Sequence, residues 1–469
     1  MAAASNHAPR CKAFVIAGTH SGCGKTLVSL AVMAALRARG LGVAPFKAGP
    51  DFIDPTLHAA VCGRASHNLD PWMCGPEATR AILLRHARGS HVAVVEGVMG
   101  LFDGIAGSTD EGSTAALAKL LGLPVALVLD ARSMARSVAA LALGYTSFDP
   151  QLPVAGLILN RVGSPNHADL LREALETAPN LPSAARILGL LPRDEALALP
   201  SRHLGLVTAQ DAPLDPGLVA RLARWAEDNL DLTRLLNACP ALEFPAPDPA
   251  PAPAARVRIG LARDAAFCFT YAENLRLLEA AGAQLVPFSP LAGRTLPPDL
   301  AGLYLPGGYP ELHAAALAAN AGLRAEIKAF SAAGRPVYAE CGGFMYLMES
   351  IKDPEGRTHP MCGAFAMAAA MLPRFAALGY REVVTTRAGL FGPEWTMLRG
   401  HEFHYSSPTG ADPEAQPLYR VRDRRGWTDQ AEGFAKGNTL GSYIHLHLAS
   451  NPDAAAAFVG ACRAKPAIE

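Results

Sequence analysis

Short apolar runs alternate with longer helical stretches through the first half of the chain. The runs are rich in Val, Ile, Leu and Ala, and they lie at 13–17, 42–46, 92–95, 125–129, 154–159 and 186–190. Short apolar, β-branched runs separated by helices are typical of a parallel sheet covered on both faces. We therefore expect an α/β fold in this half, with residues 27–39 as its first helix.

The second half begins with the same pattern and then changes. Parallel strands are predicted at 258–262, 284–288, 301–305 and 336–339, and the last of them is followed by a helix at 344–350. Beyond about residue 360 the helical stretches become rare, and strands at 380–386, 398–404 and 439–446 predict a more antiparallel flank. This half is therefore also expected to be α/β.

A segment rich in proline and alanine, residues 239–256, separates the halves. Proline fixes φ and has no N–H to donate, so alternating Ala and Pro cannot form a helix or a central strand. Such a segment is an extended, semi-rigid linker. The chain is thus predicted to hold two domains, 1–238 and 257–469.

Composition narrows the function classes. The 469 residues carry 42 Lys+Arg and 42 Asp+Glu, and this zero balance argues against a protein that binds nucleic acid through bulk charge. The nine cysteines contain no CxxC pair, so neither a disulfide framework nor a zinc ribbon is indicated. No apolar run is long enough to span a bilayer, so we expect a cytoplasmic protein without a membrane partner.

Polar side chains follow the carboxyl ends of the predicted strands in the first half. They are Lys47, Glu96, Asp130, Asn160 and Arg193. Ligands of open α/β sheets bind along this edge.

A glycine-rich turn after the first strand predicts a phosphate site on the same edge. Its residues are Gly18, Thr19, His20, Ser21, Gly22, Cys23, Gly24, Lys25 and Thr26. Backbone N–H groups of such a turn cradle phosphates, the lysine reaches the β and γ oxygens, and the threonine hydroxyl binds Mg²⁺. The first glycine lies one position earlier than in the strict motif, and the alternative is a helix-capping turn without a ligand.

Carboxylates near this turn are candidate Mg²⁺ ligands, because Mg²⁺ takes oxygen donors. Glu96 ends an apolar strand, while Asp51 and Asp54 lie beside Lys47. For the aspartates, and for Asp103, the alternative is an ordinary turn role.

Asn160 is a candidate adenine-binding residue, since it follows a strand at the same edge. The Asn-Lys-x-Asp pattern of guanine readers is missing here, which favours ATP. The alternative for Asn160 is a simple turn.

A cysteine in the second half has the setting of a nucleophile. Cys341 lies between a predicted strand and helix, and Gly342 and Gly343 follow it. This is the cysteine form of a nucleophile elbow, in which the helix N-terminus favours thiolate. The N–H groups of Gly342 and Gly308 are candidate oxyanion donors.

The base would be a histidine supplied from elsewhere in the fold. His445 and His447 alternate on a predicted strand and would share one face. A pair of structural histidines is the alternative. A metal site is less favoured, because no cysteine or third histidine lies at ligand spacing. The 401–404 stretch, HEFH, is also one residue shorter than HExxH.

The chain resembles the cobyrinate a,c-diamide synthase family, the glutamine-hydrolysing amidotransferases of corrin biosynthesis, over nearly its whole length. The matching stretches are GTHSGCGKT at 18–26, FKAGPDFIDP at 46–55, VEGVMGLFDG at 95–104, LPGGYPEL at 305–312, AECGGFMYL at 339–347, RGHEFHYS at 399–406 and SYIHLH at 442–447. The first half is also similar to dethiobiotin synthetases. The resemblance implies a phosphate-loop synthetase domain at 1–238 and a class I glutaminase domain at 257–469.

The same resemblance implies roles for individual residues. It makes Cys341 the nucleophile and His445 its base. It assigns Thr26, Asp51 and Glu96 to the metal, and Asp54 and Asp103 to substrate activation. Many class I glutaminases carry His-x-Glu, and here His447 stands at the glutamate position. The group that orients His445 is therefore open.

The implied reaction is amidation of the a and c carboxylates of cobyrinate with ATP, Mg²⁺ and glutamine, through an acyl phosphate. Hydrogenobyrinate and nickel-sirohydrochlorin are alternative macrocycles, and the oligomeric state is open, with a homodimer among the options. A more remote alternative is a phosphate-loop switch ATPase with an inactive glutaminase half. Such ATPases carry a signature lysine where this chain has His20.

Overall fold

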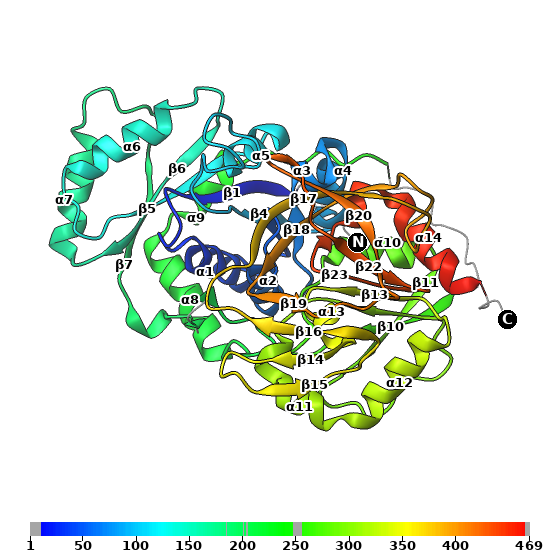
Figure 1. The fold of residues 1–469 in the computed structure, drawn as a ribbon. Helices are drawn as coiled ribbons and strands as arrows, with labels where there is room; N and C mark the ends of the chain where they lie inside the picture. The colour runs from blue at the N-terminus through cyan, green and yellow to red at the C-terminus, as the bar shows by residue number, and fades with distance from the viewer. Residues whose placement is uncertain (1–10, 184, 200, 203–204, 247–255, 465–469) are drawn as a thin grey trace, which may run out of the picture. The chain divides into compact units, whose positions relative to one another are not determined.

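The computed structural model describes residues 11–464, apart from 184, 200, 203–204 and 247–255. Two compact units divide the chain at residues 247 and 248 (Figure 1). That division falls inside the proline- and alanine-rich segment, of which residues 247–255 lie outside the described part. Each unit is described by itself below.

The first unit is built on a parallel sheet with the order β3-β2-β4-β1-β5-β6-β7. Its strands are β1 (Lys12–Gly18), β2 (Val43–Ala48), β3 (His67–Leu69), β4 (Val92–Glu96), β5 (Val125–Asp130), β6 (Val154–Val162) and β7 (Ile187–Pro192). The predicted strands are confirmed with shifts of up to three residues at their ends. Among the described strands of this sheet, β3, a short edge strand, was not predicted.

Helices connect these strands. They are α1 (Lys25–Ala38), α2 (Ile53–Cys62), α3 (Pro71–Cys74), α4 (Pro76–Ala87), α5 (Thr114–Leu121), α6 (Ser137–Ser147), α7 (Pro165–Glu176), α8 (Pro216–Asn229) and α9 (Leu232–Ala238), and a small hairpin pairs β8 (Ser201–Arg202) with β9 (Gly205–Leu206). Side chains of α1, α2, α8 and α9 form one apolar cluster with β1, β4 and β5. Burial of this cluster fixes α1, and therefore the loop before it, against the sheet.

The start of α1 differs from those of three later helices of this unit. Ser113, Ser164 and Asp215 cap α5, α7 and α8 by accepting backbone N–H bonds with their side chains. Gly24 stands at the N-cap of α1, and no side chain caps that helix. Because the first N–H groups of a helix need acceptors, this end is suited to an external anion.

The beginning of the predicted linker packs on the first unit. The N–H of Ala13 donates to the Pro240 carbonyl at 3.3 Å, and the N–H of Leu242 donates to the Cys11 carbonyl at 2.8 Å. Residues 240–242 therefore pair with the start of β1 and are not part of a free linker.

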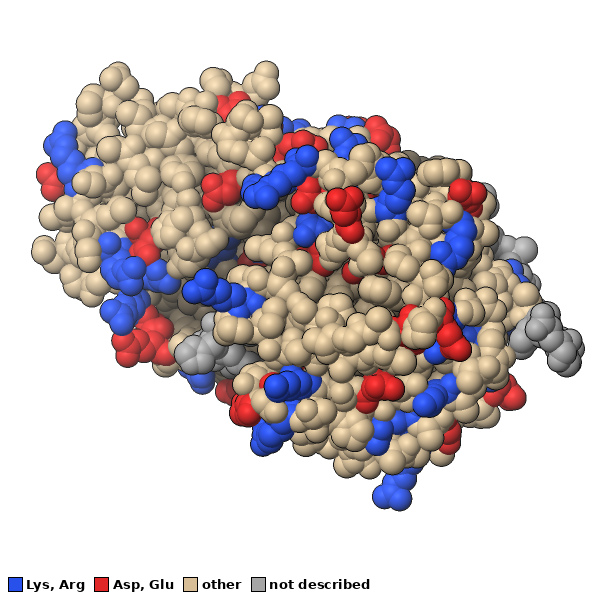
Figure 2. Space-filling model, in the orientation of Figure 1, with Lys and Arg blue, Asp and Glu red and all other residues tan. Residues whose placement is uncertain are grey.

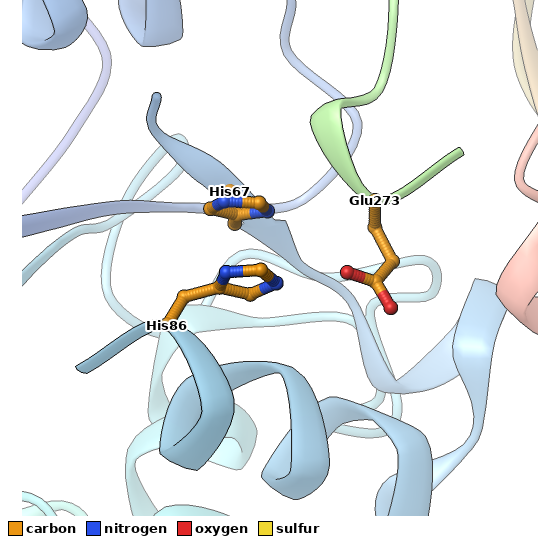
Figure 3. A group of neighbouring side chains, drawn as sticks. All are labelled: His67, His86 and Glu273. Carbon is orange, nitrogen blue, oxygen red and sulfur yellow. The ribbon is translucent and has the colours of Figure 1, made fainter. Parts of the chain in front are cut away.

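Strand β3 is held in place by stacking between two histidine rings. His67 stacks on His86 of α4 with 3.4 Å between ring centroids and 12° between planes (Figure 3). Glu273, which Figure 3 also labels, belongs to the second unit. It pairs with Arg276 at 2.6 Å. The stack fixes β3 and α4 together at the sheet edge.

The second unit contains a mixed sheet with the order β11-β10-β12-β13-β23-β22-β20-β17-β18-β24. The first five of these strands run parallel: β11 (Ala283–Phe288), β10 (Val257–Ala262), β12 (Gly302–Leu305), β13 (Val337–Glu340) and β23 (Thr439–Ser442). The others pair antiparallel: β22 (Glu432–Lys436), β20 (Gln416–Asp423), β17 (Ala377–Thr385), β18 (Met397–His404) and β24 (His445–Leu446), with β21 (Gly426–Trp427) beside β20. The predicted antiparallel flank is confirmed.

A smaller sheet has the order β15-β14-β16-β19, formed by β15 (Thr358–Pro360), β14 (Met348–Lys352), β16 (Phe365–Met371) and β19 (Ser406–Thr409). The helices of this unit are α10 (Ala272–Ala280), α11 (Ala314–Ala319), α12 (Ala321–Ala332), α13 (Gly342–Leu347) and α14 (Pro452–Arg463).

Two predictions for the second unit were wrong. The helix expected at 344–350 is α13, which ends at Leu347, because Met348 begins a strand of the smaller sheet. The single strand expected at 439–446 is divided, since β23 pairs with β13 whereas β24 pairs with β18. A local apolar pattern does not reveal such a change of partner.

Charged side chains of both signs are interspersed on the face shown in Figure 2. This agrees with the even charge balance of the sequence. Among the described helices, none combines the length and the hydropathy needed to cross a bilayer.

Candidate active site

The phosphate loop lies between β1 and α1, as predicted. Gly24 has φ 97°, a left-handed conformation that glycine adopts without strain. A Cβ at this position would lie 2.2 Å from the side-chain nitrogen of Asn160, so only glycine fits. The loop therefore depends on both the backbone freedom and the small size of this residue.

Lys25 folds back over the loop. Its Nζ donates to the His20 carbonyl at 3.1 Å, and the residue is buried. Burial lowers the pKa of Lys25, and the nearby Lys47 adds to this, while Glu96 and Asp54 oppose it. A cation held beside the N–H groups of a glycine-rich loop is suited to a phosphate chain.

Asn160 supports the loop from the next strands. Its amide nitrogen donates to the Cys23 carbonyl at 2.9 Å, and its oxygen accepts from the Arg161 N–H at 2.9 Å. Arg161 also pairs with Asp130 and donates to the Gly22 carbonyl at 2.8 Å. The side-chain nitrogen of Asn160 has a second N–H, which is able to donate to a base. Contact of Asn160 with adenine therefore stays a prediction.

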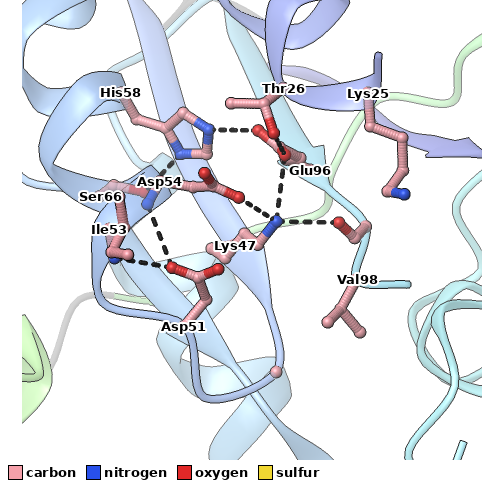
Figure 4. Close-up of polar contacts among 12 residues, drawn as sticks. Lys25, Thr26, Lys47, Asp51, Ile53, Asp54, His58, Ser66, Glu96 and Val98 are labelled. Carbon is pink, nitrogen blue, oxygen red and sulfur yellow. Dashed lines mark hydrogen bonds and ion pairs between the residues drawn. The ribbon is translucent and has the colours of Figure 1, made fainter. Parts of the chain in front are cut away.

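Glu96 is the centre of a buried polar network (Figure 4). Its Oε1 accepts from the Thr26 hydroxyl at 2.7 Å and from Lys47 Nζ at 3.0 Å. Its Oε2 lies 2.6 Å from His58 Nε2, and Lys47 also bonds Asp54 at 2.6 Å. The sequence predicted that Thr26, Lys47 and Glu96 would meet, and the structure brings them together.

The charged groups of this network shift each other's pKa values. Burial lowers the pKa of Lys47, but Asp54, Glu96 and Asp51 outweigh it and raise the pKa overall. Burial raises the pKa of Glu96, but Lys47 and His58 outweigh it and keep the carboxylate ionised. Burial and the charges of Asp51 and Glu96 raise the pKa of Asp54, against the effect of Lys47. Asp54 is therefore the carboxyl of this group that takes up a proton most readily.

The other aspartates have contacts that fit turns. One Asp51 oxygen accepts from the N–H groups of Ile53 and Asp54 at 2.7 and 3.1 Å, at the start of α2. One Asp103 oxygen accepts from the Gly100 N–H at 2.8 Å. These bonds match the turn alternative, and the metal and substrate roles of Asp51 and Asp103 remain predictions.

His58 was missed by the sequence reasoning. It is fully buried on α2, where it contacts Glu96 and lies 3.1 Å from the Ser66 hydroxyl. The available signal was its spacing, since His58 follows Asp54 by four positions and such residues share one helix face.

The cysteine elbow of the second unit has the expected strained backbone. Cys341 lies between β13 and α13 with φ 44° and ψ −104°, an unusual conformation for a residue with a side chain. Its N–H donates to the Ser442 carbonyl of β23 at 2.7 Å. A neighbouring strand thus holds the turn in the strained form.

The Gly307–Gly308 turn packs against both the elbow and the histidine. A Cβ on Gly342 would lie 3.0 Å from the Gly308 nitrogen, so the two predicted oxyanion donors are neighbours. A Cβ on Gly307 would lie 2.2 Å from Cε1 of His445. Glycine at 307 therefore lets the imidazole approach the turn that the elbow also touches.

His445 lies on β24, opposite His401 of β18. Its Nδ1 lies 3.7 Å from an oxygen of Glu340, the last residue of β13. His447 lies beyond the strand, where it begins a 3₁₀ turn and packs 4.7 Å from Tyr271. Burial lowers the pKa of His447 to about 4, so this residue is neutral.

Burial opposes the thiolate that the elbow motif favours at Cys341. Burial raises the pKa of Cys341, and the charge of Glu311 adds to this, while the Gly342 N–H acts in the opposite direction. In the free protein, burial therefore favours the protonated thiol. The sequence indicated the favourable N–H but not the extent of burial.

The 401–404 stretch forms ion pairs. Glu402 is buried between Arg381 at 2.7 Å and His404 at 2.8 Å. His404 stacks on Tyr443 with 4.1 Å between centroids. Arg381, His404 and Tyr443 border a cavity of about 500 Å³, which Glu432 and Gln430 also line.

Comparisons with known proteins agree with the two sites. Residues 14–207 match the model of the CobQ/CobB/MinD/ParA nucleotide binding domain, and residues 258–453 match that of the CobB/CobQ-like glutamine amidotransferase domain. A cobyrinate a,c-diamide synthase of Syntrophotalea carbinolica is 47% identical over 97% of this chain and 99% of its own. The chain belongs to the cobyrinate a,c-diamide synthase family.

Further members of the cobyrinate a,c-diamide synthase family match over the same extent. Those of a Synechococcus species and of Salmonella typhimurium are 42% and 41% identical, each over 97% of this chain and 99% of their own. The resemblance drawn from the seven sequence stretches is thereby confirmed, as is the α/β fold with a nucleotide-binding domain and a glutamine amidotransferase domain.

Proposed function

We propose that this enzyme amidates the a and c carboxylates of cobyrinate with ATP and glutamine. The observation that carries the proposal is the pairing of two sites on one chain of this family. In one, Thr26 and Lys47 meet at Glu96 behind a phosphate loop. In the other, a strained Cys341 and His445 flank the same glycine turn.

In the first step, a substrate carboxylate attacks the γ-phosphorus of ATP, and the bond to the β–γ bridging oxygen breaks. ADP leaves and an acyl phosphate forms. Lys25 and the N–H groups of the loop neutralise charge on the phosphates, which is the main requirement of phosphoryl transfer. Asn160 is proposed to contact the adenine while it supports the loop.

The oxygen donors of this site fit Mg²⁺. Thr26, Glu96 and Asp51 offer a hydroxyl and two carboxylates, the donor class that Mg²⁺ takes. When bound, the ion would neutralise charge on the phosphate oxygens. Lys47 holds Glu96 in its ionised form and so keeps this donor ready.

In the second step, glutamine supplies the nitrogen. His445 takes the thiol proton, and Cys341 attacks the glutamine amide carbon. The N–H groups of Gly308 and Gly342 stabilise the oxyanion, at ~3 kcal/mol for each donor. Ammonia leaves with the proton returned by His445, and water then hydrolyses the thioester to glutamate. The ammonia displaces phosphate from the acyl phosphate, and the amide is formed.

Cobyrinate is favoured among the macrocycles because the relatives that match over 97% of the chain carry its name. Hydrogenobyrinate and nickel-sirohydrochlorin present related peripheral acids and remain alternatives. The remote alternative, a switch ATPase, needs no glutamine turnover.

A turnover assay tests the proposal. The purified chain is given ATP, Mg²⁺, glutamine and each macrocycle in turn, and products are weighed by mass spectrometry. We expect two successive losses of 1 Da from cobyrinate, since each conversion of an acid to an amide changes OH to NH₂. Diamide formation only with another macrocycle would reassign the substrate, and ATP hydrolysis without any amide would support the switch ATPase.

A further inference from the structure

Glu340 lies next to the nucleophile, but it is neither the nucleophile nor the base. It is the residue before Cys341, it ends β13, and it is almost fully buried. Buried carboxylates are costly unless they are paired and hydrogen-bonded, so its retention next to the elbow needs a cause.

Two tyrosines hold the Glu340 carboxylate. The Tyr338 hydroxyl donates to Oε1 at 2.5 Å, and the Tyr304 hydroxyl donates to Oε2 at 2.9 Å. Burial and the charge of Glu340 raise the pKa of both tyrosines, so both keep the proton that they donate. The rings stack on each other with 5.3 Å between centroids. The carboxylate is therefore fixed in place.

The same carboxylate contacts the histidine strand twice. Its Oε1 accepts from the Leu446 N–H at 3.2 Å, which fixes the backbone directly after His445. Its Oε2 lies 3.7 Å from Nδ1 of the His445 ring. Glu340 thus contacts both the backbone and the ring of the strand that carries the base.

The position that usually supplies an orienting carboxylate cannot do so here. His447 is neutral, and its Nδ1 accepts from the Ala449 N–H at 3.3 Å. It therefore carries no negative charge with which to balance an imidazolium at His445.

We infer that Glu340 is the positioning residue of the glutaminase centre: it directs Nδ1–H of His445 toward itself, leaves Nε2 to take the Cys341 proton, and balances the imidazolium that results. The carboxylate comes from the residue before the nucleophile and not from the position two after the histidine. Hydrogen bonds of catalytic groups are often long before substrate binds, and 3.7 Å fits that state. The inference rests on the proposed glutaminase function.

The first test is Glu340→Gln, which keeps the shape and removes the charge. We expect kcat for glutamine hydrolysis to fall by about 10²-fold or more, since the loss of a carboxylate partner leaves the wrong tautomer. KM for glutamine and amidation from ammonium chloride should stay unchanged, because Glu340 is buried behind the elbow. A wild-type kcat in Glu340→Gln would overturn the inference.

Asp353→Asn is the matched control. Asp353 is also a buried carboxylate of the second unit next to a histidine, at 2.8 Å from His359, and it has no place in the site. Its variant should keep the wild-type kcat even where it lowers stability. An equal loss of kcat in both variants would mean a structural effect, and the inference would fail.

The second test uses neither a Glu340 variant nor an activity measurement. ¹⁵N NMR of histidine-labelled wild-type protein reports the tautomer of His445, whose signal is assigned by its loss in His445→Asn. The Nδ1–H tautomer is expected, and the Nε2–H tautomer would overturn the inference. If Cys341→Ala still hydrolysed glutamine, the proposed function would fail instead, so the two failures can be told apart.

Discussion

The phosphate-loop site keeps Lys47 and Glu96 charged, whereas burial in the cysteine site favours a neutral nucleophile. Around Glu96 each buried charge has a partner within 3.0 Å, and the pairing outweighs burial for Lys47 and Glu96. At Cys341 burial outweighs the helix N–H, and the thiol holds its proton. The first site is thus organised before its ligand arrives, but the second requires a proton transfer to become reactive.

The difference fits the chemistry of the two sites. Phosphoryl transfer needs fixed charges around the phosphates, and reorganising them during the reaction would add to the barrier. A permanent thiolate would be open to oxidation and alkylation without substrate. A thiol that ionises only through His445 avoids this.

The largest effect is expected when a fixed charge is removed from the phosphate site. Lys25→Ala should lower ATP-dependent amidation by about 10³-fold or more with either glutamine or ammonium chloride, because both depend on the acyl phosphate. The measurement is amide formation by mass spectrometry. Lys119→Ala, which removes a lysine paired with Asp110 and Asp149, is the control and should remain active. Product formation by Lys25→Ala at the wild-type rate would contradict the phosphate-loop assignment.

A smaller loss is expected from the partner of Glu96. His58→Asn should lower amidation by about 10–100-fold, as is typical when a group that orients a metal ligand is lost. The apparent Mg²⁺ requirement should rise in parallel, and a titration of the initial rate against Mg²⁺ measures it. His91→Asn, at an exposed histidine that accepts from the Gly42 N–H, is the control. An unchanged Mg²⁺ dependence in His58→Asn would contradict a role of this network in binding Mg²⁺.

The neutral thiol predicts a pH dependence. The pKa of Cys341 lies above its ordinary value, so the thiolate fraction should rise about tenfold for each pH unit between 7 and 9. Alkylation of this cysteine by iodoacetamide without glutamine, followed by peptide mass spectrometry, should show that slope. The Cys268→Ser background removes a more exposed cysteine. An alkylation rate that is already constant near pH 7 would indicate a thiolate–imidazolium pair. That result would contradict the difference proposed between the two sites.

The last effect concerns the stability of the second unit. Burial and the charge of Glu402 raise the pKa of Glu432 from 4.5 to about 7. The folded state then binds more protons than the unfolded state between these values, so stability falls as pH rises from 4.5 to 7. Glu432→Gln should remove this fall, and its stability relative to the wild type should increase by up to about 3 kcal/mol over that range. Calorimetry at several pH values measures it, and a constant difference would count against a neutral Glu432 at low pH.

Much of the first unit could be predicted from local patterns. Its strands are short apolar runs, and Lys47 and Glu96 stand at strand ends that share one sheet edge. The edge strand β3 could not be predicted, because its His-Asn-Leu sequence carries no apolar pattern and is fixed by the stack of His67 on His86.

The second unit shows what local patterns miss. Motifs in the sequence indicated Cys341, Gly342 and His445 as site residues. The structure adds that the elbow and His445 both lie against the Gly307–Gly308 turn. Burial of the thiol depends on the whole fold and could not be predicted from the elbow alone. Glu340 was overlooked because a glutamate at a strand end next to a cysteine has no distinctive spacing.

Division of labour between a charged phosphate site and a neutral thiol is tested most directly by Cys341→Ala. The account predicts that this variant loses glutamine-dependent amidation by about 10³-fold or more. It should still form the diamide from ATP and ammonium chloride at the wild-type rate, as should Cys362→Ala, a control at another buried cysteine of the second unit. Loss of both nitrogen sources in folded Cys341→Ala, or retained use of glutamine, would contradict it.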